Sequence, residues 1–229
     1  MKSDVCYLFL CTNGFNKSEL WCDYFSHSNI VIHNKTNTEG IPTVFHKFCI
    51  NPNPTEWGTI SLVNATLYLI KIGLEWYPNC THFVLLCGAS VPLQNRIVCE
   101  EIIRSQSHSC FSEIKVEKSK RIPKKYSKHS SKMSQWFIMT KNDAIWYTNH
   151  KDIKTFENVF APDETYFICL AKFNKRHYLN KNFMYVKWDL IFKYHPLNKK
   201  YYNFRSPNEY KEITEEMKQS NCLFARKLI

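Results

Sequence analysis

The sequence predicts an α/β fold in which a mostly parallel sheet is flanked by helices. Residues 5–11 and 82–87 are continuous apolar runs, which is typical of strands buried on both faces. Between them, residues 55–76 carry apolar side chains at steps of three and four, the period of an amphipathic helix. Strands that alternate with helices in this way favour a parallel sheet, with ligands at the carboxyl ends of its strands.

The first half of the chain carries the clearest elements. A Thr-Asn-Gly turn follows the apolar run at residues 5–11. Residues 16–25 fit a short helix, and residues 30–33 fit a second strand. Thr55 stands where an N-cap would open the long helix at residues 55–76.

The second half continues the alternation less regularly. The strand at residues 82–87 ends at Gly88, and Pro92 is expected to open a helix that runs to Arg104. The remaining expected elements are strands at residues 135–140 and 184–188 and helices at residues 141–149, 162–173 and 207–220.

The bulk composition is that of one globular domain. The 229 residues, 44% of them hydrophobic and 15% aromatic, are enough to bury a sizeable core. No internal repeat, low-complexity tract or linker divides them. The composition therefore excludes a disordered chain and a repeat array.

Ten cysteines are spread along the chain with no Cys-x-x-Cys pair and no Cys/His cluster, which argues against a structural zinc site. The chain enters a strand-like run at once, and no apolar stretch reaches the length of a membrane span. We therefore expect a cytoplasmic protein with reduced thiols.

The formal net charge of +11 indicates attraction to polyanions, anionic membranes or phosphorylated ligands. Much of it lies in a basic segment between Lys115 and Lys132. This segment is either a solvated loop that keeps the protein soluble or a flap over an anionic ligand. A peripheral contact with an anionic membrane is also left open.

Six short motifs follow one another over most of the chain. Together they resemble the core-2/I-branching enzymes of glycosyltransferase family 14, and the plant-type branch more closely than the animal one. Each motif alone is weak, and the signal lies in their order. The motifs are residues 57–63 (WGTISLV), 82–93 (HFVLLCGASVPL), 134–137 with 141–144 (SQWF and KNDA), 162–167 (PDETYF), 195–196 (HP) and 223–227 (LFARK).

The resemblance implies a GT-A-like, Rossmann-type fold in a single glycosyltransferase domain over residues 1–229. Residues 1–110 would form the nucleotide-sugar-binding half and residues 111–229 the acceptor and catalytic half. The implied reaction is inverting transfer of N-acetylglucosamine or xylose from a UDP-sugar donor to a glycan or glycoprotein acceptor. The family works without a divalent metal, so no cofactor and no metal ligands are expected. The sequence agrees in having no Asp-x-Asp triplet.

Glu164 is the catalytic candidate. Inverting transfer in one displacement needs one base that takes the proton from the attacking hydroxyl. By resemblance, Glu164 is that base. Read locally, Pro162, Asp163 and Glu164 also suit the start of a helix, where acidic residues favour the helix dipole. Asp163 is interpreted as a cap or as a residue that orients a neighbour.

Lys227, with Arg226 beside it, is the candidate clamp for the donor diphosphate. The resemblance carries over the lysine through the motif at residues 223–227. The arginine that the family places upstream has no clear counterpart, and Arg205 and Lys187 are the candidate substitutes. The alternative is ordinary charge near a chain end.

Gly88 and Ser90 follow a strand at the edge where a nucleotide would bind, so they are candidate nucleotide contacts. Gln135, Trp136 and Lys132 are candidate acceptor contacts, because an indole can stack on a sugar face. The alternatives are a plain strand-to-loop turn for Gly88 and ordinary packing for Trp136.

Two other functions are considered. Lysines and arginines interleaved with Tyr126 could follow a phosphate backbone, but no nucleic-acid-binding motif is present, which argues against a nucleic-acid partner. A catalytically inactive glycosyltransferase-like binding module is the third alternative, because the upstream arginine is missing.

Overall fold

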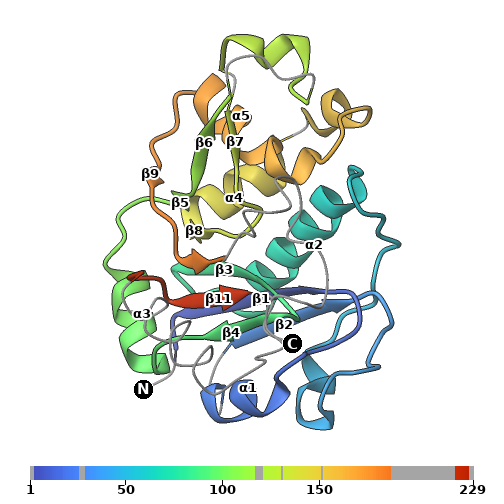
Figure 1. Ribbon diagram of the computed structural model, residues 1–229, viewed down its shortest axis with the longest axis vertical. Helices are drawn as coiled ribbons and strands as arrows, with labels where there is room; N and C mark the ends of the chain where they lie inside the picture. Colours follow the sequence, from blue (N-terminus) through green and yellow to red (C-terminus); the bar gives the residue numbers. More distant parts are fainter. Residues whose placement is uncertain are drawn as a thin grey trace, which may run out of the picture.

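The structure is a computed structural model and describes residues 3–25, 29–116, 121–129, 131–150, 152–186 and 220–226. At its centre is a six-stranded sheet with helices packed around it (Figure 1). The strand order is β2-β1-β3-β8-β5-β9. The bounds are Asn29–Asn34 for β2, Val5–Cys11 for β1, His82–Cys87 for β3, Ile138–Thr140 for β8, Cys110–Phe111 for β5 and Leu179–Asn180 for β9.

The sheet is mostly parallel, as the sequence predicts. β1 runs parallel to β2 and β3, and β9 runs parallel to β5. β8 runs antiparallel to both of its neighbours. Every residue of β1, β2 and β3 is buried, which explains their unbroken apolar sequences. Because these three strands are parallel, their carboxyl ends meet at one edge of the sheet.

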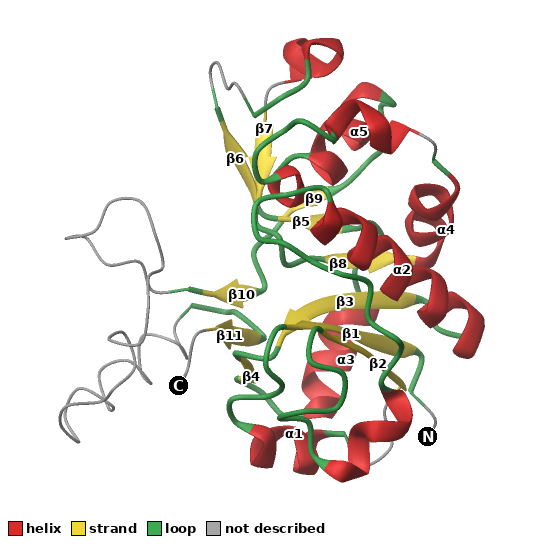
Figure 2. Ribbon diagram, turned by 90° about the vertical axis from the view of Figure 1, so that its right-hand side faces the viewer, coloured by secondary structure: helices red, strands yellow, loops and turns green. Residues whose placement is uncertain are grey.

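The long helix α2 (Ser61–Trp76) packs on β1 and β2 and against α4 (Lys141–Asn149). Helices α1 (Ser18–Tyr24) and α3 (Arg96–Arg104) lie below this part of the sheet (Figure 2). The bounds of α4 confirm the prediction. The predicted start of α2 at Thr55 is wrong, because Gly58 has a φ of +77°. That left-handed conformation cannot continue a right-handed helix.

The helix predicted from Pro92 begins later. Residues Ser90–Pro92 form the strand β4, and α3 covers Arg96–Arg104. The Asn95 side-chain oxygen accepts a hydrogen bond from the Val98 N–H at 3.0 Å. Asn95 is therefore the N-cap of α3, and the residues before it are free to form a strand.

β4 belongs to a three-stranded sheet beside the central one. It pairs antiparallel with β11 (Phe224–Arg226), which pairs parallel with β10 (Met184–Tyr185). The strand expected at residues 184–188 is thus present where it is described, whereas β11 was not predicted. This small sheet brings Arg226, near the end of the chain, next to the loop that follows β3.

The single helix predicted at residues 162–173 is two elements. Pro162–Glu164 form a short 3-10 helix, η4, and Tyr166–Phe173 form α5. Thr165 separates them with a φ of −127°, outside the helical range. Glu164 therefore ends a tight turn in front of a buried helix.

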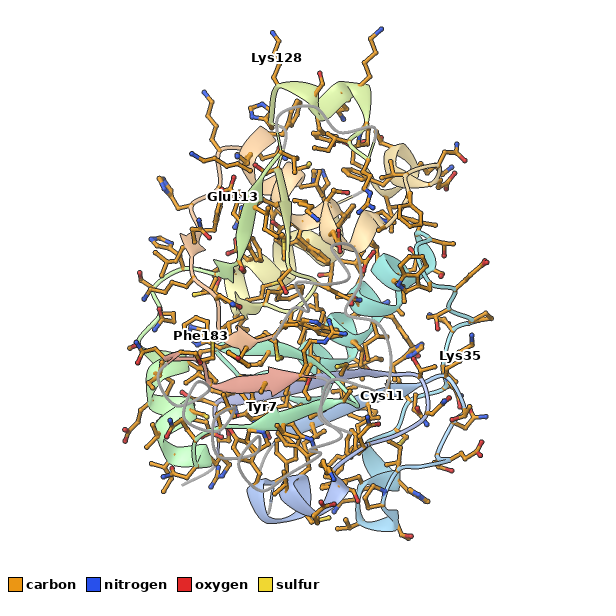
Figure 3. All side chains as sticks on the ribbon, viewed as in Figure 1. Tyr7, Cys11, Lys35, Glu113, Lys128 and Phe183 are labelled. Carbon is orange, nitrogen blue, oxygen red and sulfur yellow. The ribbon has the colours of Figure 1, made fainter. Side chains whose placement is uncertain are left out.

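The basic segment is anchored at both ends. Its ends pair as the antiparallel strands β6 (Glu113–Lys115) and β7 (Ser131–Met133). Tyr126 between them is fully buried and stacks on Phe156, with ring centroids 5.2 Å apart. Figure 3 shows Lys128 of the same segment pointing away from the body of the protein. Within residues 121–129, the segment is thus structured and has an exposed basic outer side.

Glu113 fastens the β6–β7 hairpin to α5. Its carboxylate accepts hydrogen bonds from Lys172 (2.6 Å), Tyr178 (2.6 Å) and Ser131 (2.5 Å). Burial alone would raise the pKa of Glu113, but these hydrogen bonds and the Lys172 charge together lower that pKa to about 2.

The remaining elements are short. All ten cysteines are described, and all are free thiols. No helix among the described residues combines the length and apolar character that a bilayer crossing requires. Of the helix predicted at residues 207–220, all but Ser220 lies outside the described residues. The other helices are α1 (Ser18–Tyr24) and the 3-10 helices η1 (Thr43–Phe48), η2 (Lys124–His129) and η3 (Asp152–Phe156).

Candidate active site

Glu164 lies between two cations. Its Oε2 atom is 3.2 Å from Nη1 of Arg121 and 3.6 Å from Nζ of Lys132. These two ion pairs hold the carboxylate in place. Because the Glu164 side chain is 35% exposed, the carboxylate can still be reached from solvent. The sequence placed Lys132 at the site, and the structure brings it to Glu164. Arg121 was not singled out.

The turn that carries Glu164 is locked to the start of α2. Ala161 has a φ of +51°, and its N–H donates a hydrogen bond to the Gly58 carbonyl at 2.8 Å. A β-carbon at Gly58 would lie 2.8 Å from the Phe160 ring, closer than atoms can approach. Glycine at position 58 therefore leaves room for the Phe160 ring, and its φ of +77° is one that other residues rarely adopt.

Asp163 lies beside Glu164 in a different environment. It is only 9% exposed, and its Oδ1 atom has no hydrogen-bond partner in the described parts of the chain. Burial raises the pKa of Asp163 to about 6, the Glu164 charge adds to the rise, and Arg121 and Arg226 oppose it. Asp163 does not cap η4 through its side chain. Its predicted role as a cap is therefore not supported.

Arg226 and Trp136 form a second part of the site. The Arg226 guanidinium lies over the Trp136 ring, 4.6 Å from its centroid, in a cation–π contact. The buried Nε1 of Trp136 and Nε of Arg226 have no hydrogen-bond partner within the described ranges. The Arg226 charge also acts on Asp163. Strand β11 and the loop before β8 thus meet at this contact.

The site therefore combines a reachable carboxylate with several cations. Glu164 pairs with Arg121 and Lys132, and the charges of Arg121 and Arg226 act on Asp163. Such a cluster can take a proton from a hydroxyl and can stabilise negative charge on a neighbouring group. In the described residues, no group of three or more His, Cys, Asp or Glu side chains is placed to hold a metal ion.

Gly88 holds the loops at the carboxyl edge of the sheet together. A β-carbon there would lie 1.8 Å from the Gly14 carbonyl oxygen. The Gly88 carbonyl accepts a hydrogen bond from the Asn16 N–H at 2.9 Å. The close approach that requires glycine is thus between two protein loops. A nucleotide contact by the Gly88 backbone stays a prediction.

Ser90 is fully buried and used by the fold. Its hydroxyl accepts a hydrogen bond from the Cys87 N–H at 3.1 Å, and its carbonyl accepts one from the Trp21 indole at 2.9 Å. The Ser90 side chain therefore stabilises the turn after β3, and no part of it faces solvent.

Of the other residues predicted for the site, only Gln135 is described by the structure. Gln135 is half-buried beside Trp136. Lys227, Arg205 and Lys187 lie outside the described residues. Sequence reasoning missed Arg121, although it lies in the basic segment that was considered as a flap over an anion. The available signal was the basic charge of that segment, and this charge did not distinguish Arg121 from the other basic residues in it.

The chain is similar to known proteins in sequence and in structure. Residues 5–216 match the Core-2/I-Branching enzyme family. No curated protein matches the sequence. Among solved structures, the chain aligns with the "crystal structure of a glycosyltransferase involved in the glycosylation of the major capsid of PBCV-1" at 14% identity and a TM-score of 0.48. That alignment covers 97% of this chain and 93% of the other.

Proposed function

Because this chain belongs to the Core-2/I-Branching enzyme family, it is a glycosyltransferase, and we propose that it works by metal-independent inverting transfer. The donor is a UDP-sugar, with N-acetylglucosamine or xylose as the sugar. The acceptor is a hydroxyl of a glycan or glycoprotein. Glu164 is the general base, and side-chain cations stabilise the departing diphosphate.

The accessibility of Glu164 is the observation that supports this proposal most. Of the two adjacent carboxyl groups, Asp163 is buried and Glu164 is open to solvent. A general base must come within hydrogen-bonding distance of the hydroxyl that it deprotonates. The contact with Arg121 fixes the direction of the Glu164 carboxylate, so an incoming hydroxyl meets an oriented base.

The departing diphosphate is assigned to the Arg226 side of the site. Diphosphate oxygens accept hydrogen bonds, and the buried Arg226 Nε–H has no acceptor in the described residues. Lys227 follows directly in the sequence and is the second cation of this clamp. Fixed cations can stabilise the charge that develops on a leaving group. They would thus supply what a metal ion supplies in other enzymes.

Transfer assays on wild type and Glu164→Gln test this function. Thermal-shift screening against nucleotide-sugars first identifies the donor, because a ligand that binds the native state raises its stability. Glu164→Gln should then lose transfer by about a hundredfold or more while it still binds the donor. Glu157→Gln, an exposed change on a nearby turn, is the matched control. Glu164→Gln with wild-type transfer would remove Glu164 from the mechanism.

Peripheral contact with an anionic membrane is a separate, secondary part of the proposal. Its support is the exposed basic side of the segment at residues 121–129, where Lys128 points outward (Figure 3). Such binding depends on charge and weakens as salt screens it. Co-sedimentation with phosphatidylserine vesicles at low and high salt tests it. Equal recovery with neutral vesicles would argue against a charge-driven contact.

A further inference from the structure

Two exposed aromatic side chains lie next to the candidate active site. Trp57 is 65% exposed, the largest value for a large hydrophobic side chain in the described residues, and Phe160 is 46% exposed. Their rings meet edge to face, with centroids 5.3 Å apart. Neither residue belongs to the core, and the catalytic proposal uses neither. Large aromatic side chains left open side by side often mark a binding surface.

Arg121 connects this aromatic pair to the base. Its guanidinium lies over the Phe160 ring, 4.7 Å from the centroid, and its Nη1 atom is 3.2 Å from Glu164 Oε2. One planar cation therefore contacts both an exposed ring and the carboxylate. Phe160, Arg121 and Glu164 thus form a continuous chain of contacts.

The position of the pair is fixed by the backbone. The Ala161 N–H bonds to the Gly58 carbonyl, so the residues that follow Trp57 and Phe160 are tied together. Gly58 has a positive φ and a side-chain-free face against which Phe160 packs. Rigid presentation lowers the entropy lost on binding, because little has to be ordered when a ligand arrives.

We propose that Trp57 and Phe160 form a carbohydrate-binding platform for the part of the acceptor beyond the sugar that is glycosylated. This inference rests on the proposed function, and it adds the substrate class: an acceptor of at least two sugar units. The C–H faces of a pyranose ring are apolar and stack on aromatic rings, while its hydroxyls reach the neighbouring guanidinium. Continuity with Glu164 through Arg121 favours an acceptor glycan over a protein partner.

Acceptor length provides the test. Transfer rates are measured with neutral monosaccharide glycosides and with oligosaccharides of two to four units, for wild type, Trp57→Ala and Trp57→Phe. We expect Trp57→Ala to lose about tenfold in kcat/KM for the longer acceptors, mainly through KM. Monosaccharide transfer and donor hydrolysis should stay unchanged. Trp57→Phe should retain most of the effect, because it keeps an aromatic face.

The matched control is Trp76→Ala. Trp76 is 41% exposed and lies at the opposite end of α2 from Trp57. This variant should behave as wild type with every acceptor. An equal loss for Trp57→Ala with monosaccharides, or no loss with longer acceptors, would overturn the platform. Concentration-dependent self-association that Trp57→Ala abolishes, with acceptor kinetics unchanged, would also overturn it and identify a protein interface.

A binding measurement separates this inference from the proposed function. Saturation-transfer NMR with the same oligosaccharides reports contact without requiring turnover. Signal that disappears in Trp57→Ala but not in Trp76→Ala supports the platform even if no donor is ever turned over. Oligosaccharide signal that is identical in wild type and Trp57→Ala contradicts the platform, whatever the enzyme assay shows.

Discussion

Asp163 and Glu164 are consecutive in the chain, yet their carboxyl groups lie in opposite environments. Asp163 is buried, and its Oδ1 atom has no partner among the described residues, whereas Glu164 is partly exposed between Arg121 and Lys132. Burial and the neighbouring charge raise the pKa of Asp163 to about 6. Asp163 therefore binds a proton at a higher pH than an ordinary aspartate does.

Asp163→Asn should stabilise the protein at neutral pH. A carboxyl whose pKa is raised on folding binds its proton more tightly in the native state than in the unfolded chain. Its contribution therefore becomes unfavourable as pH rises from about 4 to about 6, and the cost stays constant above that. A rise of about two pKa units corresponds to roughly 3 kcal/mol in the free energy of unfolding.

Urea unfolding between pH 4 and pH 8 measures this effect. The stability gain of Asp163→Asn should grow through this range and level off above pH 6, and Glu157→Gln should show no such trend. A gain or loss for Asp163→Asn that does not vary with pH would mean that Asp163 has an ordinary pKa.

Glu113→Gln should have the opposite pH dependence. The pKa of Glu113 is lowered to about 2 in the folded protein, so its ionised form stabilises the native state. That contribution is fully present above the pKa of the unfolded chain, about 4.3, and is lost as pH falls toward 2. Thermal unfolding should show Glu113→Gln less stable than wild type at pH 7, with the two converging in acid. A constant difference across this range contradicts the network with Lys172.

Arg121→Ala should slow transfer by about ten- to a hundredfold, because the Glu164 carboxylate loses the contact that fixes its direction. Most of the loss should appear in kcat, with donor affinity little changed. Lys124→Ala is the control, since Lys124 is an exposed lysine of the same basic segment. Equal activities of the two variants would show that Arg121 contributes only general charge.

Arg226→Ala should weaken UDP binding by about tenfold or more, because a charge-assisted hydrogen bond to the diphosphate is lost. Isothermal titration with UDP measures this directly. Arg104→Ala removes an exposed arginine that pairs with Asp4 and should leave UDP affinity unchanged. An unchanged Kd for Arg226→Ala would remove this residue from the diphosphate clamp.

The fold was predictable where burial dictates the sequence. The strands at residues 5–11 and 82–87 are buried along their whole length, so their apolar runs are unbroken. Errors arose where a few residues set the backbone conformation. Because Gly58 has a positive φ, α2 begins later in the sequence than predicted. Because β4 pairs with β11, α3 also begins later than predicted. The residues around Pro92 carry no local sign of a partner strand more than a hundred positions away.

The candidate site was predictable in part. Glu164 and Lys132 were named from the sequence, and in the structure Glu164 Oε2 lies 3.6 Å from Lys132 Nζ. Arg121 and the aromatic pair could not be inferred, because their roles depend on contacts between segments far apart in the chain. In the sequence, Trp57 was identified only as one residue of the motif at residues 57–63. Its exposure and its contact with Phe160 come from the tertiary structure.

Proton NMR of the transfer reaction tests the central claim most directly, because it gives both the rate and the anomeric configuration of the first product. We predict that wild type gives a product with configuration opposite to that of the UDP-sugar. Glu164→Gln should form that product at least about a hundredfold more slowly, with UDP affinity unchanged. Retained configuration, or a Glu164→Gln rate within about twofold of wild type, would contradict Glu164 as the base.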